Sequence, residues 1–419
     1  MSGSIAQLQS RAEQNARPPA LWLRRLRLSA FRSYARATIE TDNRPVVLTG
    51  ANGAGKTNLL EAISFLAPGR GLRRAKLGEV EQRRPAGENA GDPAHLGGWA
   101  IAALLETLEG PRELGTGRDP AARDNESDNG RERRLIKIDG ALARSQQALD
   151  ELLRLVWLTP QMDGLFRDSA SGRRRFLDRL VVSFDSAHGG RLTGYEQAQR
   201  ERSRLLAEGR RDDRWLAALE ETMAGRAIAV TAARRALVAR LDEAAGLAPG
   251  SFPKAGLALT GETERWLDEM PALGAEDRLR ERLAATRDED AASGSTLVGP
   301  QRSDLEVTHL DKDLPANLCS TGEQKALLVS IVLAHARLVA LERGAAPILL
   351  LDEVVAHLDG GRRESLYQCL LELGAQAWLT GTDEALFAPL GAAAQFFRVR
   401  EATVTPAPLS DARSRLAAQ

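Results

Sequence analysis

The alternation of apolar and polar residues predicts strands in the first third of the chain. Residues 21–28, LWLRRLRL, alternate between apolar and basic side chains, which is typical of a half-buried strand. Residues 99–105 and 135–138 have similar strand character. Together these segments predict an antiparallel β layer.

Two other segments of the first third lack such a pattern. Residues 1–20 are polar and end at Pro18 and Pro19, and we expect a loose, disordered tail. Residues 109–132 are rich in Gly, Arg, Asp, Asn and Glu without periodicity, which favours a mobile loop.

The pattern becomes helical between residues 172 and 246, where Ala, Arg, Leu and Glu dominate. A continuous helix over 213–245 would span about 50 Å at 1.5 Å per residue. Pro249 and Pro253 end this region. A strand over 252–261 and a charged helix over 276–288 follow. We therefore expect a helical arm over 172–298, inserted between an N-terminal lobe, 21–171, and a C-terminal lobe, 299–419.

Composition adds a few constraints. A chain of 419 residues has material for two or three domains, and its formal net charge of zero means that any basic surface must be local. Two cysteines without metal-type spacing fit a reducing cytosol. The first residues have no apolar signal region, and the most apolar window, 327–341, contains His335 and Arg337. We expect a soluble, cytoplasmic protein.

The segment GANGAGKT fits the phosphate-binding pattern G-x-x-x-x-G-K-[ST]. An apolar strand precedes it and a helix follows it, so the phosphates would meet a helix N-terminus. The glycines let backbone N–H groups point at one anion, Lys56 adds a positive charge, and the hydroxyl of Thr57 can bind Mg²⁺. The expected ATP-binding residues of this loop are Gly50, Ala51, Asn52, Gly53, Ala54, Gly55, Lys56, Thr57 and Asn58.

A second candidate part of the site lies far downstream, where the apolar run ILLL is followed by the acidic residues Asp352 and Glu353. The apolar run predicts a buried parallel strand, which we expect next to the strand of the phosphate loop. Asp352 at its end is placed to organise Mg²⁺ and its water. Glu353 is placed to polarise the attacking water and is, with Lys56, an expected catalytic residue.

The segment STGEQ, which begins at Ser320, predicts a capped helix start. Ser320 is a plausible N-cap and Glu323 follows three residues later, as in a capping box. A helix of about 20 residues and then the acidic strand follow, and this order resembles the signature segment of ABC-type ATPases. The resemblance implies that this segment binds the γ-phosphate of nucleotide held by the opposite subunit. The residues concerned are Ser320, Thr321, Gly322 and Glu323.

Three further positions resemble elements of the same superfamily. Gln161 in VWLTPQMDGLF resembles the glutamine that senses Mg²⁺ and water, and it is a candidate metal ligand and catalytic residue. Asp359 resembles the D-loop aspartate. The strand that ends at Thr380 lacks the switch histidine that transporter ATPases usually carry there.

Several ordered segments together resemble the RecF family of bacterial recombination ATPases over residues 21–405. They are LRLSAFRSYARATIE, GKTNLLEAISFLAPGRGLRRAK, GRRRFLDRL, GPQRSDLEV, STGEQKALL, DEVVAHLD and LTGTD. The sequence departs from that pattern at Gln161, where many members have an acidic residue, and at Gln301, where they have histidine. Residues 109–132 are also longer than in that pattern.

The resemblance implies a fold, cofactors and partners. The fold is an α/β ABC-type ATPase head, a mixed sheet with an antiparallel β layer and an inserted helical arm. ATP and Mg²⁺ would be sandwiched between the subunits of an ATP-dependent homodimer. Gapped or junction DNA, RecO, RecR and RecA are the implied partners, and Arg32 is implied to lie against the adenine.

Local basic runs are candidates for contacts with the DNA backbone, which rely on Arg and Lys. A solvated charged helix face explains them as well. The candidates are Arg70, Arg73, Arg74 and Lys76 after the phosphate loop, and Arg173, Arg174 and Arg175 at the start of the arm.

Three other functions use the same phosphate loop. A transporter ATPase subunit is disfavoured because no switch histidine or membrane-coupling element is present. A small-molecule kinase would turn over without dimerisation and without the Ser320 segment. A purely structural SMC-like protein would have no need of Lys56 and Glu353.

Overall fold

The computed structural model describes residues 21–82, 98–118, 134–209, 212–247 and 250–407. The chain forms two compact units. The first contains residues 1–162, 249–251 and 336–419, and the second contains 163–248 and 252–335. The segment around Ser320 therefore belongs with the arm, and the expected boundary at residue 298 does not coincide with a boundary of these units.

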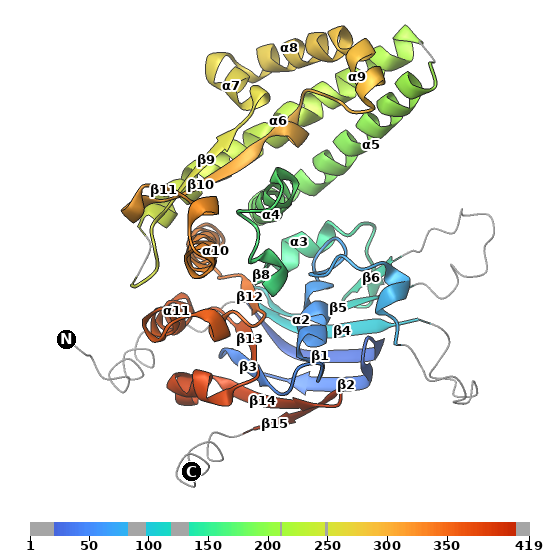
Figure 1. Cartoon of the computed structure of the whole chain (residues 1–419). Helices are drawn as coiled ribbons and strands as arrows, with labels where there is room; N and C mark the ends of the chain where they lie inside the picture. Colours follow the sequence, from blue (N-terminus) through green and yellow to red (C-terminus); the bar gives the residue numbers. More distant parts are fainter. Residues whose placement is uncertain (1–20, 83–97, 119–133, 210–211, 248–249, 408–419) are drawn as a thin grey trace. The chain divides into compact units, whose positions relative to one another are not determined.

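The first unit contains an antiparallel sheet of six strands in the order β2-β1-β4-β5-β6-β7 (Figure 1). The strands predicted near residues 21, 99 and 135 are confirmed as β1, β4 and β6. The six are β1 (Trp22–Phe31), β2 (Tyr34–Glu40), β4 (Ala100–Thr107), β5 (Gly110–Arg118), β6 (Arg134–Ile138) and β7 (Ala141–Leu142).

The prediction of a mobile loop over 109–132 is wrong for its first part. Residues 110–118 form β5, which pairs with β4 and β6. Leu114 and Thr116 face the core while their neighbours are less buried, so pairing on both sides overrides the weak strand propensity of this Gly-rich segment. Residues 119–132 lie outside the described residues.

The second sheet of the first unit has the order β15-β14-β3-β13-β12-β8, in which all pairs are parallel except β14 with β15. The expectation that the acidic strand β12 lies next to the phosphate-loop strand β3 is wrong, because β13 lies between them. An apolar run shows that a strand is buried but not which strands flank it. The strands are β3 (Val46–Thr49), β8 (Leu155–Leu158), β12 (Ile348–Leu351), β13 (Ala377–Gly381), β14 (Gln395–Arg400) and β15 (Thr403–Pro406).

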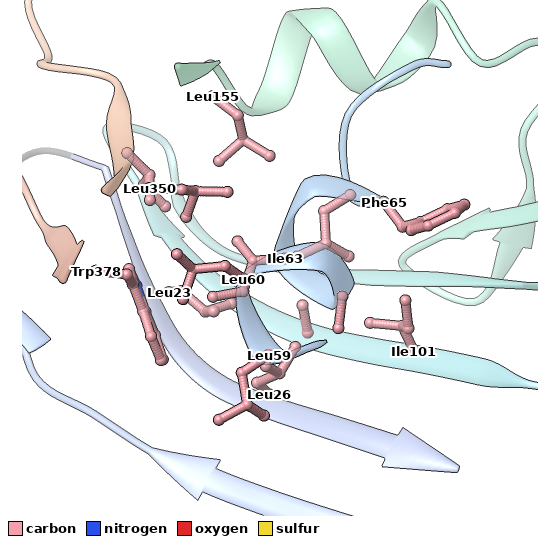
Figure 2. Packing of buried hydrophobic residues seen from close by; sticks show 14 of the residues in the cluster. Leu23, Leu26, Leu59, Leu60, Ile63, Phe65, Ile101, Leu155, Leu350 and Trp378 are labelled. Carbon is pink, nitrogen blue, oxygen red and sulfur yellow. The ribbon is translucent and has the colours of Figure 1, made fainter. Parts of the chain in front are cut away.

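Helix α2 (Lys56–Ser64) connects the two sheets in one hydrophobic core (Figure 2). Its Leu59, Leu60 and Ile63 share a cluster with Leu23 of β1 and Trp378 of β13. The phosphate loop is thus anchored on a buried helix. The other helical elements of this unit are η1 (Leu77–Val80), α3 (Ala148–Leu152), η5 (Pro160–Met162), η9 (Val355–His357), α11 (Gly360–Leu373) and η10 (Glu384–Ala393).

The second unit is mainly helical, and its longest helix is α6 (Asp213–Gly246), as predicted. The side chain of Asp212 caps α6 by accepting from the backbone N–H groups of Arg214 and Trp215. The predicted strand appears as β9 (Ala255–Thr260), and two helices, α8 (Ala272–Ala285) and α9 (Arg287–Ser293), cover the predicted charged helix.

The remaining elements of this unit follow in chain order. The helices are α4 (Ala170–Val182), α5 (His188–Ala207), α7 (Glu262–Glu269), α8 (Ala272–Ala285), α9 (Arg287–Ser293) and α10 (Thr321–Arg343), whose last residues belong to the first unit. Between them lie η6 (Pro300–Arg302), β10 (Asp304–His309), η7 (Leu310–Lys312), β11 (Leu314–Pro315) and η8 (Ala316–Leu318).

In the described part of the chain, α10 is the one helix that is long and apolar enough to cross a membrane. However, 78% of its most apolar window is buried inside the protein. A buried core helix has the same length and composition, and α10 is packed as one.

Candidate nucleotide-binding site

The phosphate loop between β3 and α2 requires glycine at two positions. Gly50 has φ of 154°, and a Cβ there would lie 2.2 Å from the carbonyl oxygen of Val399. Gly55 has φ of 114°, and a Cβ there would lie 2.7 Å from the hydroxyl of Tyr34. That hydroxyl donates to the carbonyl oxygen of Gly55 at 3.1 Å. The loop is therefore packed so closely against the backbone of Val399 and the side chain of Tyr34 that neither glycine position has room for a Cβ.

Lys56 folds back into this loop. Its Nζ donates to the carbonyl oxygens of Gly50 at 2.7 Å and Ala51 at 2.9 Å. Burial lowers the pKa of Lys56, while the carboxylates of Glu353 and Asp352 raise it. The ammonium group thus lies inside the loop and close to both acidic residues, where an anion can replace the carbonyl contacts.

The structure brings Thr57 and Asp352 together, although 295 residues separate them. The hydroxyl of Thr57 donates to Oδ1 of Asp352 at 3.0 Å. Asp352 is 4% exposed, and its backbone N–H donates to the carbonyl oxygen of Leu158 at the end of β8. Two of the predicted metal ligands are therefore neighbours.

These two oxygen donors fit Mg²⁺, which uses one or two protein ligands together with phosphate and water oxygens. The described residues contain no cluster of three or more His, Cys, Asp or Glu that could hold a metal ion without such help. That Thr57 and Asp352 hold Mg²⁺ together with a nucleotide stays a prediction, and the two oxygen donors fit it. Gln161, in η5 after β8, is exposed, and its role as a metal ligand stays a prediction.

Arg32 and Arg73 share one fully buried carboxylate, that of Glu61 on α2. Arg32 binds it through two N–H groups at 2.7 and 2.9 Å, and Arg73 through one at 3.1 Å. Arg73 also donates to the side chain of Asn58 at 2.9 Å. The guanidinium of Arg32 is thus fixed beside the phosphate-loop helix, and its contact with adenine stays a prediction.

In the second unit, the start of α10 has the predicted capping box. The backbone N–H and hydroxyl of Ser320 donate to Oε2 of Glu323 at 2.9 and 2.7 Å, and the N–H of Glu323 returns a bond to the Ser320 hydroxyl. Hydrogen bonds from Lys312 and then Ser320 lower the pKa of Glu323 to about 2. Thr321 and Gly322 are exposed, so this helix N-terminus is open to solvent.

The other candidate residues are dispersed. Asp359 caps α11 by accepting from the N–H of Arg362 at 2.9 Å, and its side chain is 60% exposed. Arg173 makes a two-point ion pair with Asp304, and Arg174 donates to the carbonyl oxygen of Ser303. These two arginines therefore have structural partners. The exposed candidates for DNA contact are Arg70, Arg73, Arg74, Lys76 and Arg175, of which Arg73 already binds Glu61.

Two residues of the site were not recognised as such in the sequence. Glu61 resembles any polar residue on a helix, and only its burial shows that it organises Arg32 and Arg73. Thr380 stands where transporter ATPases usually carry the switch histidine. Its contacts with Asp352 and Glu353 depend on the strand order, which the sequence does not give. For Thr380, the sequence signal that indicates a functional role is a polar residue near the end of the otherwise apolar strand β13.

Residues 22–404 match the family described as RecF/RecN/SMC N terminal domain. A protein of Mesorhizobium japonicum named DNA replication and repair protein RecF is 50% identical over 391 residues, which cover 93% of this chain and 99% of that protein. A protein of the same name from Allorhizobium ampelinum is 50% identical over 385 residues, with 90% and 97% covered.

Solved structures resemble the fold. A structure of the recombination mediator protein RecF with ATPrS, in the RecFOR pathway, has a TM-score of 0.77 and 20% identity, and covers 93% of this chain and 98% of that one. An Smc head domain from Pyrococcus furiosus has a TM-score of 0.52 and 16% identity, with 95% and 99% covered. The fold is therefore that of an ATPase head of this class.

Proposed function

The chain belongs to the RecF family of DNA replication and repair proteins, and we propose that it is an ATP-dependent DNA-binding switch in the repair of gapped DNA. One observation supports this proposal most strongly. The phosphate loop, Thr57 and Asp352 form a connected site, although they come from opposite ends of the sequence.

The chain's own residues divide the chemistry among them. Lys56 neutralises charge on the β- and γ-phosphates, while Thr57 and Asp352 hold Mg²⁺. Mg²⁺ held by these two residues would supply positive charge that offsets the negative charge of the phosphates. Glu353 orients a water for attack on the γ-phosphate and accepts the proton of that water. Gln161, which follows β8 at the same edge of the sheet, senses Mg²⁺ and the water. Hydrolysis is slow and resets the switch.

Dimerisation follows from the open end of α10. The exposed N–H groups around Thr321 and Gly322 form an anion-binding helix start, and the capping box holds Ser320 beside it. We propose that this segment binds the γ-phosphate of ATP held by a second copy of the chain. ATP then stabilises the dimer, because each nucleotide adds contacts that only the dimer has.

The partners follow from the relatives. A matching structure is of a protein in the RecFOR pathway, so we propose that RecO and RecR act with this chain in loading RecA. DNA backbone contacts fall to the exposed cations Arg70, Arg74, Lys76 and Arg175. These partners act in the cytoplasm, where we place the protein.

The oligomeric mass tests this function when it is measured without nucleotide, with ADP and with ATP, each with and without a gapped duplex. We expect a dimer only with ATP, and faster ATP hydrolysis with DNA. Lys56→Arg tests the phosphate loop, because it keeps the positive charge but not the geometry of the loop. We expect this variant to lose ATP-driven dimerisation by about tenfold or more. A protein that stays monomeric with ATP and ignores DNA would contradict the proposal and favour a small-molecule kinase.

A further inference from the structure

We propose that Thr380 is a positioning residue for ATP hydrolysis, which holds both acidic residues in place and does not itself contact the γ-phosphate. The inference rests on the proposed ATPase function. It concerns the position where transporter ATPases have their switch histidine.

Thr380 lies at the carboxyl end of β13, between the phosphate-loop strand β3 and the acidic strand β12. Its hydroxyl donates to Oδ1 of Asp352 at 2.7 Å. The hydroxyl oxygen of Thr380 also accepts from the backbone N–H of Glu353 at 2.9 Å. The side chain is 1% exposed, so water does not compete for these bonds. One hydroxyl therefore fixes the side chain of one acidic residue and the backbone of the next.

The hydrogen bonds also fix the direction of donation. A hydroxyl has one hydrogen to donate. The amide of Glu353 can only donate, so the Thr380 oxygen accepts there and its hydrogen points to Asp352. This leaves Thr380 without a second hydrogen for a phosphate oxygen. Its role is thus different from that of a histidine that contacts the phosphate directly.

The backbone of Glu353 shows why such a clamp is needed. Its φ of 54° lies in the left-handed region, which is strained for a residue with a side chain. Asp352 is held on its other side by β8, through the carbonyl oxygen of Leu158. The acidic pair is therefore tied to both neighbouring strands, and Thr380 supplies the tie at Glu353.

Thr57 and Thr380 share Oδ1 of Asp352, but they differ in what nucleotide binding does to them. Thr57 is an expected ligand of Mg²⁺, so its bond to Asp352 is the one that nucleotide binding alters. Thr380 is not an expected ligand of Mg²⁺, so its bonds to Asp352 and Glu353 should persist when nucleotide binds. In that part, no hydrogen bond engages Oδ2 of Asp352, which stays available for the ion and its water.

The test compares Thr380→Val, which keeps the shape but removes the hydroxyl, with Thr380→Ser, which keeps the hydroxyl. For Thr380→Val we expect kcat to fall about 10–100-fold, the range found when a group that orients a metal ligand is removed. The Mg²⁺ concentration for half-maximal binding of a fluorescent ATP analogue should rise by a similar factor. Binding without Mg²⁺ should not change, and Thr380→Ser should stay within about threefold of the wild type in each measurement.

Thr405→Val, an exposed strand threonine in the same sheet, is the control for the loss of a hydroxyl. If Thr380→Val matches the wild type in kcat and in the Mg²⁺ dependence of nucleotide binding, the proposed positioning role of the Thr380 hydroxyl is wrong. If Thr380→Ser loses as much as Thr380→Val, the methyl group matters instead, and the clamp is also wrong. Should Thr380→Val not fold, Thr380→Ala against Thr380→Ser makes the same comparison.

The two proposals fail in different ways. A wild-type protein that never dimerises with ATP overturns the proposed switch. The magnesium dependence of nucleotide binding still decides the role of Thr380 in that case, because it needs neither DNA nor a dimer.

Discussion

The nucleotide site and the arm both bury charged groups, but they satisfy them differently. In the arm, buried Arg202 donates to the carboxylates of Glu220 and Asp290 and to the carbonyl oxygen of Leu283 at 2.6–2.9 Å. In the candidate nucleotide site, Lys56 donates to two carbonyl oxygens and makes no ion pair with a described residue. The charges around Arg202 stabilise the fold, whereas the charge of Lys56 has no ion-pair partner among the described residues and is expected to meet a ligand.

The arm contains a second saturated cluster of the same kind. Arg234 makes a two-point ion pair with Asp178 at 2.7 and 2.8 Å and donates to the carbonyl oxygen of Pro300. His188 binds the same carboxylate at 2.8 Å. Charges with this many partners fix how the helices pack, and removing one deprives the buried groups that remain of part of their ion pairing.

The largest effect on stability is therefore expected in the arm. Arg202→Ala should lower the free energy of unfolding by about 3–5 kcal/mol, because it leaves the buried carboxylate of Asp290 without its ion pair and that of Glu220 with Arg287 alone. Denaturant unfolding monitored by circular dichroism measures this. Arg204→Ala, at a side chain that is 55% exposed, is the matched control and should cost under about 1 kcal/mol. Equal losses for the two variants would show that the buried ion pairs of Arg202 add no more to the stability of the arm than an exposed one.

The next effect is on catalysis and should leave stability untouched. Glu353→Gln should lower kcat by about 100-fold or more, because it removes the base that orients the water. The ATP-bound dimer should then persist, and its lifetime can be followed by light scattering after free ATP is removed. The melting temperature without nucleotide should match that of the wild type. Hydrolysis at the normal rate would show that Glu353 is not the base.

The smallest effect concerns the exposed start of α10. The pKa of Glu323 is lowered to about 2 from an ordinary value of 4.5, so its carboxylate stabilises the folded state above about pH 4.5. That stabilisation is lost as the pH falls towards 2. Glu323→Gln should remove this part of the acid dependence, measured as unfolding free energy between pH 5 and pH 2. An unchanged pH profile would show that Lys312 and Ser320 do not act on Glu323 in the folded protein.

Local patterns predicted much of the fold, but not the parts that depend on pairing. The 34-residue helix α6 and the capping box at Ser320 follow from spacing within a few turns of helix. Strand β5 was missed because its pairing with β4 and β6 outweighs its composition. The neighbours of β12 could not be predicted either, because a buried parallel strand has the same apolar sequence in any position of the sheet.

The candidate site divides in the same way. The sequence by itself determined which residues are expected to meet the phosphates and the ion, because the chemistry of Lys56, Thr57 and Asp352 depends on side-chain type and on spacing within each motif. Only the tertiary structure decided how these motifs meet. The insertion of β13 between β3 and β12 puts Thr380 against Asp352 and Glu353. Contacts between residues so far apart in the chain depend on strand order and register, which local sequence does not specify.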